Sequence, residues 1–152
     1  MTAVLVKADS AHSEVISSLH ALCFKEAWNK KAITDILSMP GASGLIVTSD
    51  DDAPQGFVLM RLAADEAEII SIGVIRQARR SGLADLLLEA AIAQARKEGT
   101  TQMFLEVAED NVAAMALYEK AGFSINGRRT GYYKRTGGNT DAIAYGLKIN
   151  AK

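Results

Sequence analysis

The segment from residue 67 to residue 97 constrains the fold more than any other part of the chain. Its first nine residues, AEIISIGVI, are almost all apolar, as in a central strand that a sheet buries on both faces. A short basic turn with one glycine follows. Beyond the turn, apolar residues recur at the spacing of one helix face, at Leu83, Leu86, Leu87, Ala90 and Ala91. This strand–turn–helix unit predicts an α/β fold.

The remaining segments extend this pattern over the whole chain. Apolar runs bounded by turn residues predict strands at 3–7, 43–49, 56–63, 67–75, 102–107, 123–133 and 141–149. Helical spacing and capping residues predict helices at 10–24, 29–39, 83–97 and 111–122. The order β-α-α-β-β-β-α-β-α-β-β predicts a single mixed central sheet flanked by helices, in one domain over residues 1–152.

Composition excludes several classes of protein. The formal net charge is -1, so no overall attraction to nucleic acid or to an anionic membrane is expected. No apolar run approaches the roughly 20 residues of a membrane-spanning helix, and the N-terminal sequence does not resemble a signal peptide. Cys23 lies in an apolar helical stretch, which favours a buried thiol and fits a cytoplasmic location. His12 and His20 lack the spacing of paired metal ligands, so no metal is expected.

The basic turn before the third predicted helix has the features of an anion site. A helix N-terminus carries unpaired backbone N–H groups and a partial positive charge. Gly82 leaves the main chain accessible, and Arg79 and Arg80 add two guanidinium groups suited to phosphate oxygens. A capped surface helix with a solvated charge cluster explains this stretch equally well. The candidate cofactor-binding residues here are Arg79, Arg80, Ser81, Gly82, Leu83 and Ala84.

Two motifs give the chain a resemblance to a known family. Arg79, Gly82 and Ala84 fill the fixed positions of Q/R-x-x-G-x-G/A, the pyrophosphate-binding signature of the GNAT acyltransferases. A second hallmark of that family, N-x-x-A-x-x-L-Y-x-x-x-G-F, is matched at Asn111, Ala114, Leu117, Tyr118, Gly122 and Phe123. The segments LEV, ALYEKAGF, GYY and DAI are most similar to RimI-type enzymes, which acetylate protein N-termini. The resemblance covers nearly the whole chain and implies a GNAT fold with acetyl-coenzyme A as cosubstrate.

The resemblance implies two catalytic side chains. Tyr118 would be the general acid that protonates the departing thiolate of coenzyme A, because a phenol is protonated at neutral pH. Without the motif, a half-buried tyrosine that anchors the helix end is the simpler explanation. Asn111 is expected to cap the same helix, and the family adds a possible contact with the cofactor.

Glu106 interrupts the apolar strand MFLEV and is the candidate general base. By alternation it shares a face with Phe104, opposite Leu105 and Val107. A carboxylate near the end of a buried strand is costly unless it is paired or close to water, and such places suit a proton acceptor. RimI-type enzymes carry a glutamate here that acts as the base through water. A surface glutamate at a sheet edge is the alternative.

The apolar strand is expected to contribute main-chain groups. In the family, this strand splays from the one that carries Glu106, and the pantetheine arm pairs with the freed backbone. Backbone N–H groups from Ile72 to Val74 would then polarise the thioester carbonyl. Gly73 departs from the bulkier residue usual there, and a glycine in a strand often marks a bulge or a close approach.

The segment RRTGYYKR is the candidate acceptor-binding region. RimI-type enzymes hold the backbone of the incoming peptide with a tyrosine pair, which Tyr132 and Tyr133 match. A solvated hairpin is the alternative, and a single-stranded nucleic-acid site is disfavoured because the patch is short. Phe24 and Trp28 could wall the peptide groove, although core packing explains them equally well.

These observations predict an acetyl-coenzyme A-dependent N-acetyltransferase. Its acceptor would be a protein N-terminus, in this family typically the alanine of a small-subunit ribosomal protein, and transfer would be direct. Two other functions stay open: acetylation of a small-molecule amine, and a coenzyme A-binding module without catalysis. No membrane partner is expected.

Overall fold

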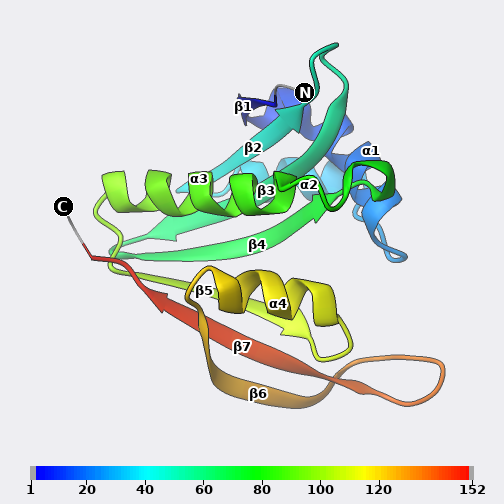
Figure 1. Ribbon diagram of the computed structural model, residues 1–152, viewed down its shortest axis with the longest axis vertical. Helices are drawn as coiled ribbons and strands as arrows, with labels where there is room; N and C mark the ends of the chain where they lie inside the picture. Colours follow the sequence, from blue (N-terminus) through cyan, green and yellow to red (C-terminus); the bar gives the residue numbers. More distant parts are fainter. Residues whose placement is uncertain (1–2, 151–152) are drawn as a thin grey trace.

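The structure is a computed structural model that describes residues 3–150, and its centre is one seven-stranded sheet with helices on both faces (Figure 1). The strand order is β1-β2-β3-β4-β5-β7-β6, and every neighbouring pair is antiparallel except β4 and β5. The sheet is therefore mixed, as predicted. The strands are β1 (Val4–Ala8), β2 (Ala42–Thr48), β3 (Pro54–Ala63), β4 (Glu66–Val74), β5 (Gln102–Ala108), β6 (Ser124–Tyr133) and β7 (Thr140–Lys148).

Within residues 3–150, four α-helices follow the predicted order. One 3-10 turn leads into the first helix, and another, over Arg76–Ala78, lies between β4 and the third helix. The helices are α1 (Ser13–Cys23), α2 (Lys30–Leu37), α3 (Leu83–Lys97) and α4 (Val112–Lys120). The first predicted helix begins instead as a 3-10 turn over Ser10–His12, because Asp9 and His12 form a reciprocal cap there. Asn29 and Asn111 cap α2 and α4 through their side-chain oxygens, which confirms both expected caps.

The sheet separates two hydrophobic layers. One lies beneath α3 and α4, and the other lies beneath α1 and α2. The alternation along β3 supplies both: Val58 points into the first layer, whereas Phe57 and Leu59 point into the second. Since both faces of β3 are covered, its buried stretch over 56–60 is apolar at every position.

The strands β4 and β5 separate after a short parallel contact. They pair only from Glu66 to Glu68 on β4, opposite Gln102 to Phe104 on β5. Beyond this point β4 continues on β3 and β5 continues on β7, so the two strands diverge toward one end of the sheet (Figure 1). The expected splay is confirmed, and the edge of β4 that faces β5 has no strand partner over 69–74.

A bulge in β4 accompanies the splay. Leu59 faces Ser71 while Met60 faces Ile69, so Ile70 is the extra residue. A bulge bends its strand and increases the local twist, which turns the end of β4 away from β5. The sequence indicates a bulge or a close approach at Gly73. The bulge lies three residues earlier, at Ile70.

Candidate active site

The β4 side of the splay presents main chain, and Gly73 allows a helix to approach it. A Cβ on Gly73 would lie 3.0 Å from the Cys23 Sγ and 3.2 Å from a ring carbon of Phe57. The C-terminal end of α1 therefore packs directly on this strand. Ile72 and Gly73 are half-buried and Val74 is buried, so the predicted segment 72–74 offers backbone rather than side chains to the splay.

The turn from β4 to α3 leaves the helix N-terminus uncapped. Gly82 is the N-cap residue with a φ of 82°, a conformation that glycine adopts without strain, and it offers no side-chain cap. The first helical hydrogen bond runs from the Leu86 N–H to the Gly82 carbonyl at 3.0 Å. The N–H groups that precede it are those a helix N-terminus leaves available to an anion. Nothing lies within 4 Å of a Cβ built on Gly82, so the approach to these groups is open.

The two arginines of this turn differ in their surroundings. The Arg79 Nε donates to the Val74 carbonyl at 2.9 Å, and its guanidinium also hydrogen-bonds the Cys23 thiol. Burial raises the pKa of that thiol, and the Arg79 charge acts in the opposite direction. Arg79 therefore braces the turn against β4 and α1. Within residues 3–150 the Arg80 guanidinium has no hydrogen-bond or ion-pair partner, and the φ of Arg80 is 65°.

The other predicted cofactor-binding residues of the turn differ in exposure. Ser81 is exposed, Leu83 is buried and Ala84 is half-buried.

The β5 side carries the predicted base. The Glu106 side chain is 31% exposed and forms an ion pair with Arg129 on β6, at 2.8 Å between Oε2 and Nε. Leu105 and Val107 point into the α3–α4 layer, which confirms that Glu106 projects from the opposite face. Sequence reasoning missed Arg129. The sequence does show two consecutive arginines, RR, in an exposed strand. It does not show that Arg129 pairs with Glu106, because this depends on the register of β6 on β7.

The predicted acid lies on the other face of β5. Tyr118 on α4 is 5% exposed, and its ring meets those of Phe123 and Tyr145 at centroid distances of 5.9 and 6.0 Å. Burial raises the pKa of Tyr118 to about 12, and Tyr133 adds to this rise. The phenol therefore keeps its proton throughout the neutral range. Among the described residues its hydroxyl has no hydrogen-bond partner.

The two tyrosines at the end of β6 lie between these groups. Burial raises the pKa of Tyr133, and the charge of Glu106 raises it further. The charge of Glu106 thus acts on the pKa of Tyr133, and Tyr133 in turn acts on the pKa of Tyr118. Tyr132 is 52% exposed, and its ring meets that of Tyr133 edge-on at 5.1 Å. The Arg129 guanidinium lies over the Tyr132 ring at 5.1 Å.

Phe24 and Trp28 pack around a histidine that sequence reasoning did not use. His20 is buried at the end of α1, and its ring lies 4.5 Å from that of Phe24 and 4.6 Å from that of Trp28. Its Nδ1 accepts from the Trp28 N–H at 3.0 Å, and burial lowers the pKa of His20. Both aromatics therefore have packing roles. Glu26, in the segment between them, contributes to raising the pKa of Arg135 on the β6–β7 loop, after the larger effect of Asp110.

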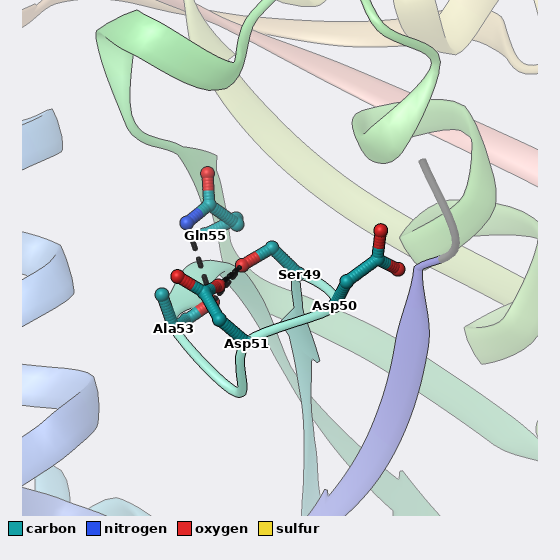
Figure 2. Close-up of a pocket in the computed structure, with 5 residues that line it drawn as sticks. All are labelled: Ser49, Asp50, Asp51, Ala53 and Gln55. Carbon is teal, nitrogen blue, oxygen red and sulfur yellow. Dashed lines mark hydrogen bonds between the residues drawn. The ribbon is translucent and has the colours of Figure 1, made fainter.

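Two surface hollows lie outside this arrangement. One, of about 370 Å³, is lined by the turn between β2 and β3, where Gln55 Nε2 donates to the Ala53 carbonyl at 3.2 Å (Figure 2). The strand order places this turn on the side of β4 away from β5. The other, of about 240 Å³, lies between α3 and α4, which an ion pair of Asp85 and Lys120 bridges at 3.6 Å.

Residues 3–150 contain neither a metal-binding cluster nor a membrane-spanning helix. No cluster of three or more His, Cys, Asp or Glu side chains in this range could hold a metal ion. None of the helices in it is long and apolar enough to cross a membrane.

Comparison with known proteins shows consistent similarities. The sequence pattern of the Acetyltransferase (GNAT) family matches residues 13–123. A [ribosomal protein bS18]-alanine N-acetyltransferase from Salmonella typhimurium is 37% identical over 100 residues, which are 66% of this chain and 68% of that protein. The crystal structure of the ribosomal-protein-S18-alanine N-acetyltransferase from Escherichia coli superposes with a TM-score of 0.92 at 26% identity, over 99% of this chain and 96% of that one.

The fold also matches a structure with a bound donor. Arabidopsis thaliana NAA60 in complex with acetyl-CoA superposes with a TM-score of 0.83, over 99% of this chain and 100% of that one. The identity is 16%, so this likeness concerns the fold alone.

Proposed function

The chain belongs to the acetyltransferase (GNAT) family, and we propose that it transfers the acetyl group of acetyl-coenzyme A to the N-terminal alanine of a small-subunit ribosomal protein. The observation that carries the proposal is the splay between β4 and β5. One side is an unpaired main-chain edge, and the other bears Glu106 and Tyr118 on its two faces. The names of the Salmonella and Escherichia coli relatives support the choice of acceptor.

The residues on the β4 side fit acetyl-coenzyme A as the donor. The uncapped N-terminus of α3 offers N–H groups to the diphosphate, and the open space at Gly82 admits it. Arg80 adds a positive charge, whereas Arg79 stabilises the turn through its hydrogen bond to the Val74 carbonyl. The free edge of β4 would pair with the pantetheine amides, and N–H groups within 72–74 would stabilise the oxyanion that forms at the thioester carbonyl.

Glu106 serves as the base in this mechanism. An α-amino group has a pKa of about 8, so a substantial part of the acceptor is neutral near pH 7 and the remainder must lose one proton. Glu106 takes this proton directly or through water, and the neutral amine attacks the thioester carbonyl. The ion pair with Arg129 at 2.8 Å holds the Glu106 carboxylate in place on β5.

Tyr118 serves as the acid. Collapse of the tetrahedral intermediate breaks the bond between the carbonyl carbon and sulfur, and the thiolate leaves. Tyr118 donates its proton to that thiolate, since its phenol is protonated and its hydroxyl is not engaged by another described residue. The attacking nitrogen releases its extra proton to solvent as the amide forms, and the Tyr118 phenolate regains a proton from solvent. Asn111 caps the helix that carries Tyr118 and so holds it in place.

The acceptor enters on the face of Glu106. Tyr132 and Tyr133 hold the peptide backbone from one side, and the segment from Phe24 to Trp28 forms the opposite wall. The attraction between Glu26 and Arg135 supports this placement, because it acts between that segment and the β6–β7 loop. The acceptor and this site lie in the cytoplasm.

A transfer assay tests the proposed function. The purified protein is incubated with acetyl-coenzyme A and a peptide whose sequence begins with alanine, and mass spectrometry locates the acetyl group. We expect acetylation of the α-amino group and release of free thiol. A matched panel contains free amino acids, polyamines and amine antibiotics. Activity on that panel alone would make the chain a small-molecule acetyltransferase, and binding without thiol release would make it a non-catalytic module.

A further inference from the structure

The acceptor side contains a carboxylate that the proposed mechanism does not use. Asp141 is the second residue of β7, and its side chain is 20% exposed. Its Oδ1 accepts from the Gly131 N–H at 2.7 Å, and its Oδ2 lies 2.5 Å from the Arg128 Nη1. Both contacts lower the pKa of Asp141, with the backbone hydrogen bond as the larger cause. One carboxylate thus joins two residues of β6 to β7.

Gly131 lies where the ladder between β6 and β7 is interrupted. Arg129 pairs with Ala142 and Tyr133 pairs with Thr140, so three residues of β6 oppose the single residue Asp141. The φ of Gly131 is 63°, which turns the strand sharply and takes its N–H out of the regular ladder. The Asp141 carboxylate supplies the acceptor that this N–H would otherwise lack.

The bulge sets the direction of the two tyrosines. Tyr132 and Tyr133 follow Gly131 directly, so the angle at which they leave the strand depends on its conformation. A one-residue change of register would move each side chain to the opposite face of the sheet. The hydrogen bond from Gly131 to Asp141 therefore determines which tyrosine faces Glu106.

Arg128 extends the same network to the catalytic strand. Its Nη1 also lies 2.6 Å from the Glu109 Oε2, and the Glu109 N–H donates to the Asp141 carbonyl at 2.9 Å. Glu109 follows Glu106 by three residues and precedes the cap of α4 by two. The network thus fixes the acceptor hairpin relative to the strand of the base and the helix of the acid.

We propose that Asp141 is a positioning residue that fixes the bulge at Gly131 and thereby places the acceptor peptide against Glu106. The inference rests on the proposed function, because it takes Tyr132 and Tyr133 as the acceptor site. The network touches no part of the β4–α3 turn. Its loss should therefore weaken use of the peptide and leave use of acetyl-coenzyme A unchanged.

Three variants separate the two contacts of Asp141. Asp141→Ala removes both, and Asp141→Asn keeps an oxygen for the Gly131 N–H but removes the charge. Arg128→Met keeps the Gly131 hydrogen bond and removes the ion pairs of Arg128 with Asp141 and with Glu109. We expect Asp141→Ala to raise the peptide KM roughly tenfold, the scale of one hydrogen bond to a charged group, with the acetyl-coenzyme A KM unchanged. Asp141→Asn and Arg128→Met should raise the peptide KM by smaller and similar factors.

Asp65→Asn is the matched control. Asp65 Oδ2 accepts from the Thr101 hydroxyl at 3.0 Å, beside the closed end of the splay where β4 and β5 still pair. This variant also removes a charged acceptor, but we expect both KM values to stay at the wild-type level. A peptide KM for Asp141→Ala within twofold of wild type, or an equal rise of both KM values, overturns the proposal.

Amide hydrogen exchange gives a readout that does not depend on activity. In Asp141→Asn and Arg128→Met, the amides of 130–133 should exchange faster than in the wild type, while those of α3 keep their rates. Unchanged exchange at 130–133 overturns the positioning role even if Asp141→Ala fails to fold. Absence of peptide acetylation by the wild type would instead refute the proposed function, and the exchange result would still decide on the bulge.

Discussion

The two sides of the splay between β4 and β5 differ in the groups that they present. The β4 side offers main chain: an unpaired strand edge, an uncapped helix and glycines at positions 73 and 82. The β5 side offers side chains, with Glu106 ion-paired on one face and Tyr118 buried on the other. A diphosphate and a pantetheine arm are the same in every donor molecule, so backbone geometry suffices to hold them. Proton transfer and acceptor choice require particular functional groups, and these come from side chains.

This difference has a consequence for substitution. On the β4 side, a new side chain acts by occupying space or by straining the backbone. On the β5 side, the loss of a functional group would remove a step of the proposed reaction. Substitutions on the two sides should therefore change different kinetic constants.

The largest expected effects are those of Glu106→Gln and Tyr118→Phe. Each removes one proton transfer, and each should lower kcat roughly 10²-fold, the usual contribution of a general acid or base. Steady-state kinetics with an alanine-led peptide measures this. Tyr145→Phe is the control: it removes a neighbouring buried hydroxyl, one that donates to Glu119 at 2.8 Å and has no role in the proposed mechanism. If Tyr118→Phe and Tyr145→Phe affect kcat equally, Tyr118 is not the acid.

The burial of Tyr118 should appear in the pH dependence of stability. Its pKa is raised to about 12, from about 10 for an exposed phenol. The native state then binds more protons between these values, so stability is fully present below about pH 10 and is lost as pH rises toward 12. The loss attributable to Tyr118 should reach about 2–3 kcal/mol. Urea unfolding of the wild type and of Tyr118→Phe across this range measures it, and equal losses in both would contradict the assignment.

Gly73→Ala tests the packing on the β4 side. Its Cβ would lie 3.0 Å from the Cys23 Sγ, so either α1 or the strand must shift. Overpacking of this kind costs about 1–3 kcal/mol of unfolding free energy. Cys23→Ala makes room, so the double variant should be more stable than the sum of the two single changes predicts. Additive effects in a thermodynamic cycle would show that the two residues do not compete for space.

The smallest expected effect is that of Gly82→Ala. Its φ of 82° strains an alanine by about 1 kcal/mol, and no atom lies within 4 Å of the new Cβ. The KM for acetyl-coenzyme A should rise severalfold at constant kcat, because the helix N–H groups move. Gly82→Asn should be closer to the wild type, since asparagine tolerates this conformation better. A fall in kcat at constant KM would contradict this prediction, because it would show that Gly82 affects the chemical step and not the binding of the donor.

Periodicity predicts the β4–α3 unit because its determinants are local. The apolar strand and the helix stripe lie next to each other in sequence, and so do the glycine and the basic turn. The bulge escaped notice because Ile69, Ile70 and Ile72 are all apolar, and a strand buried on both faces carries no alternation to break. Arg79 was expected at the phosphates, and its Nε also donates to the Val74 carbonyl, a contact that no pattern in the turn indicates.

The β5 side depends on contacts between distant segments. Glu106 and Tyr118 could be identified from family motifs, and alternation placed Glu106 on the right face. The partners Arg129 and Asp141 could not, because both depend on how the irregular strand β6 pairs with β7. Bulges change the register without a reliable sequence signal, so such ion pairs appear only in three dimensions.

An amide NMR titration tests the central claim most directly. Nitrogen-15-labelled protein is titrated with acetyl-coenzyme A, and the backbone amide shifts are followed residue by residue. The account predicts that the largest shifts fall on 83–85 at the start of α3 and on 70–74 along the free edge of β4. Large shifts at the β2–β3 turn or in the hollow between α3 and α4, with those two segments unmoved, would contradict it.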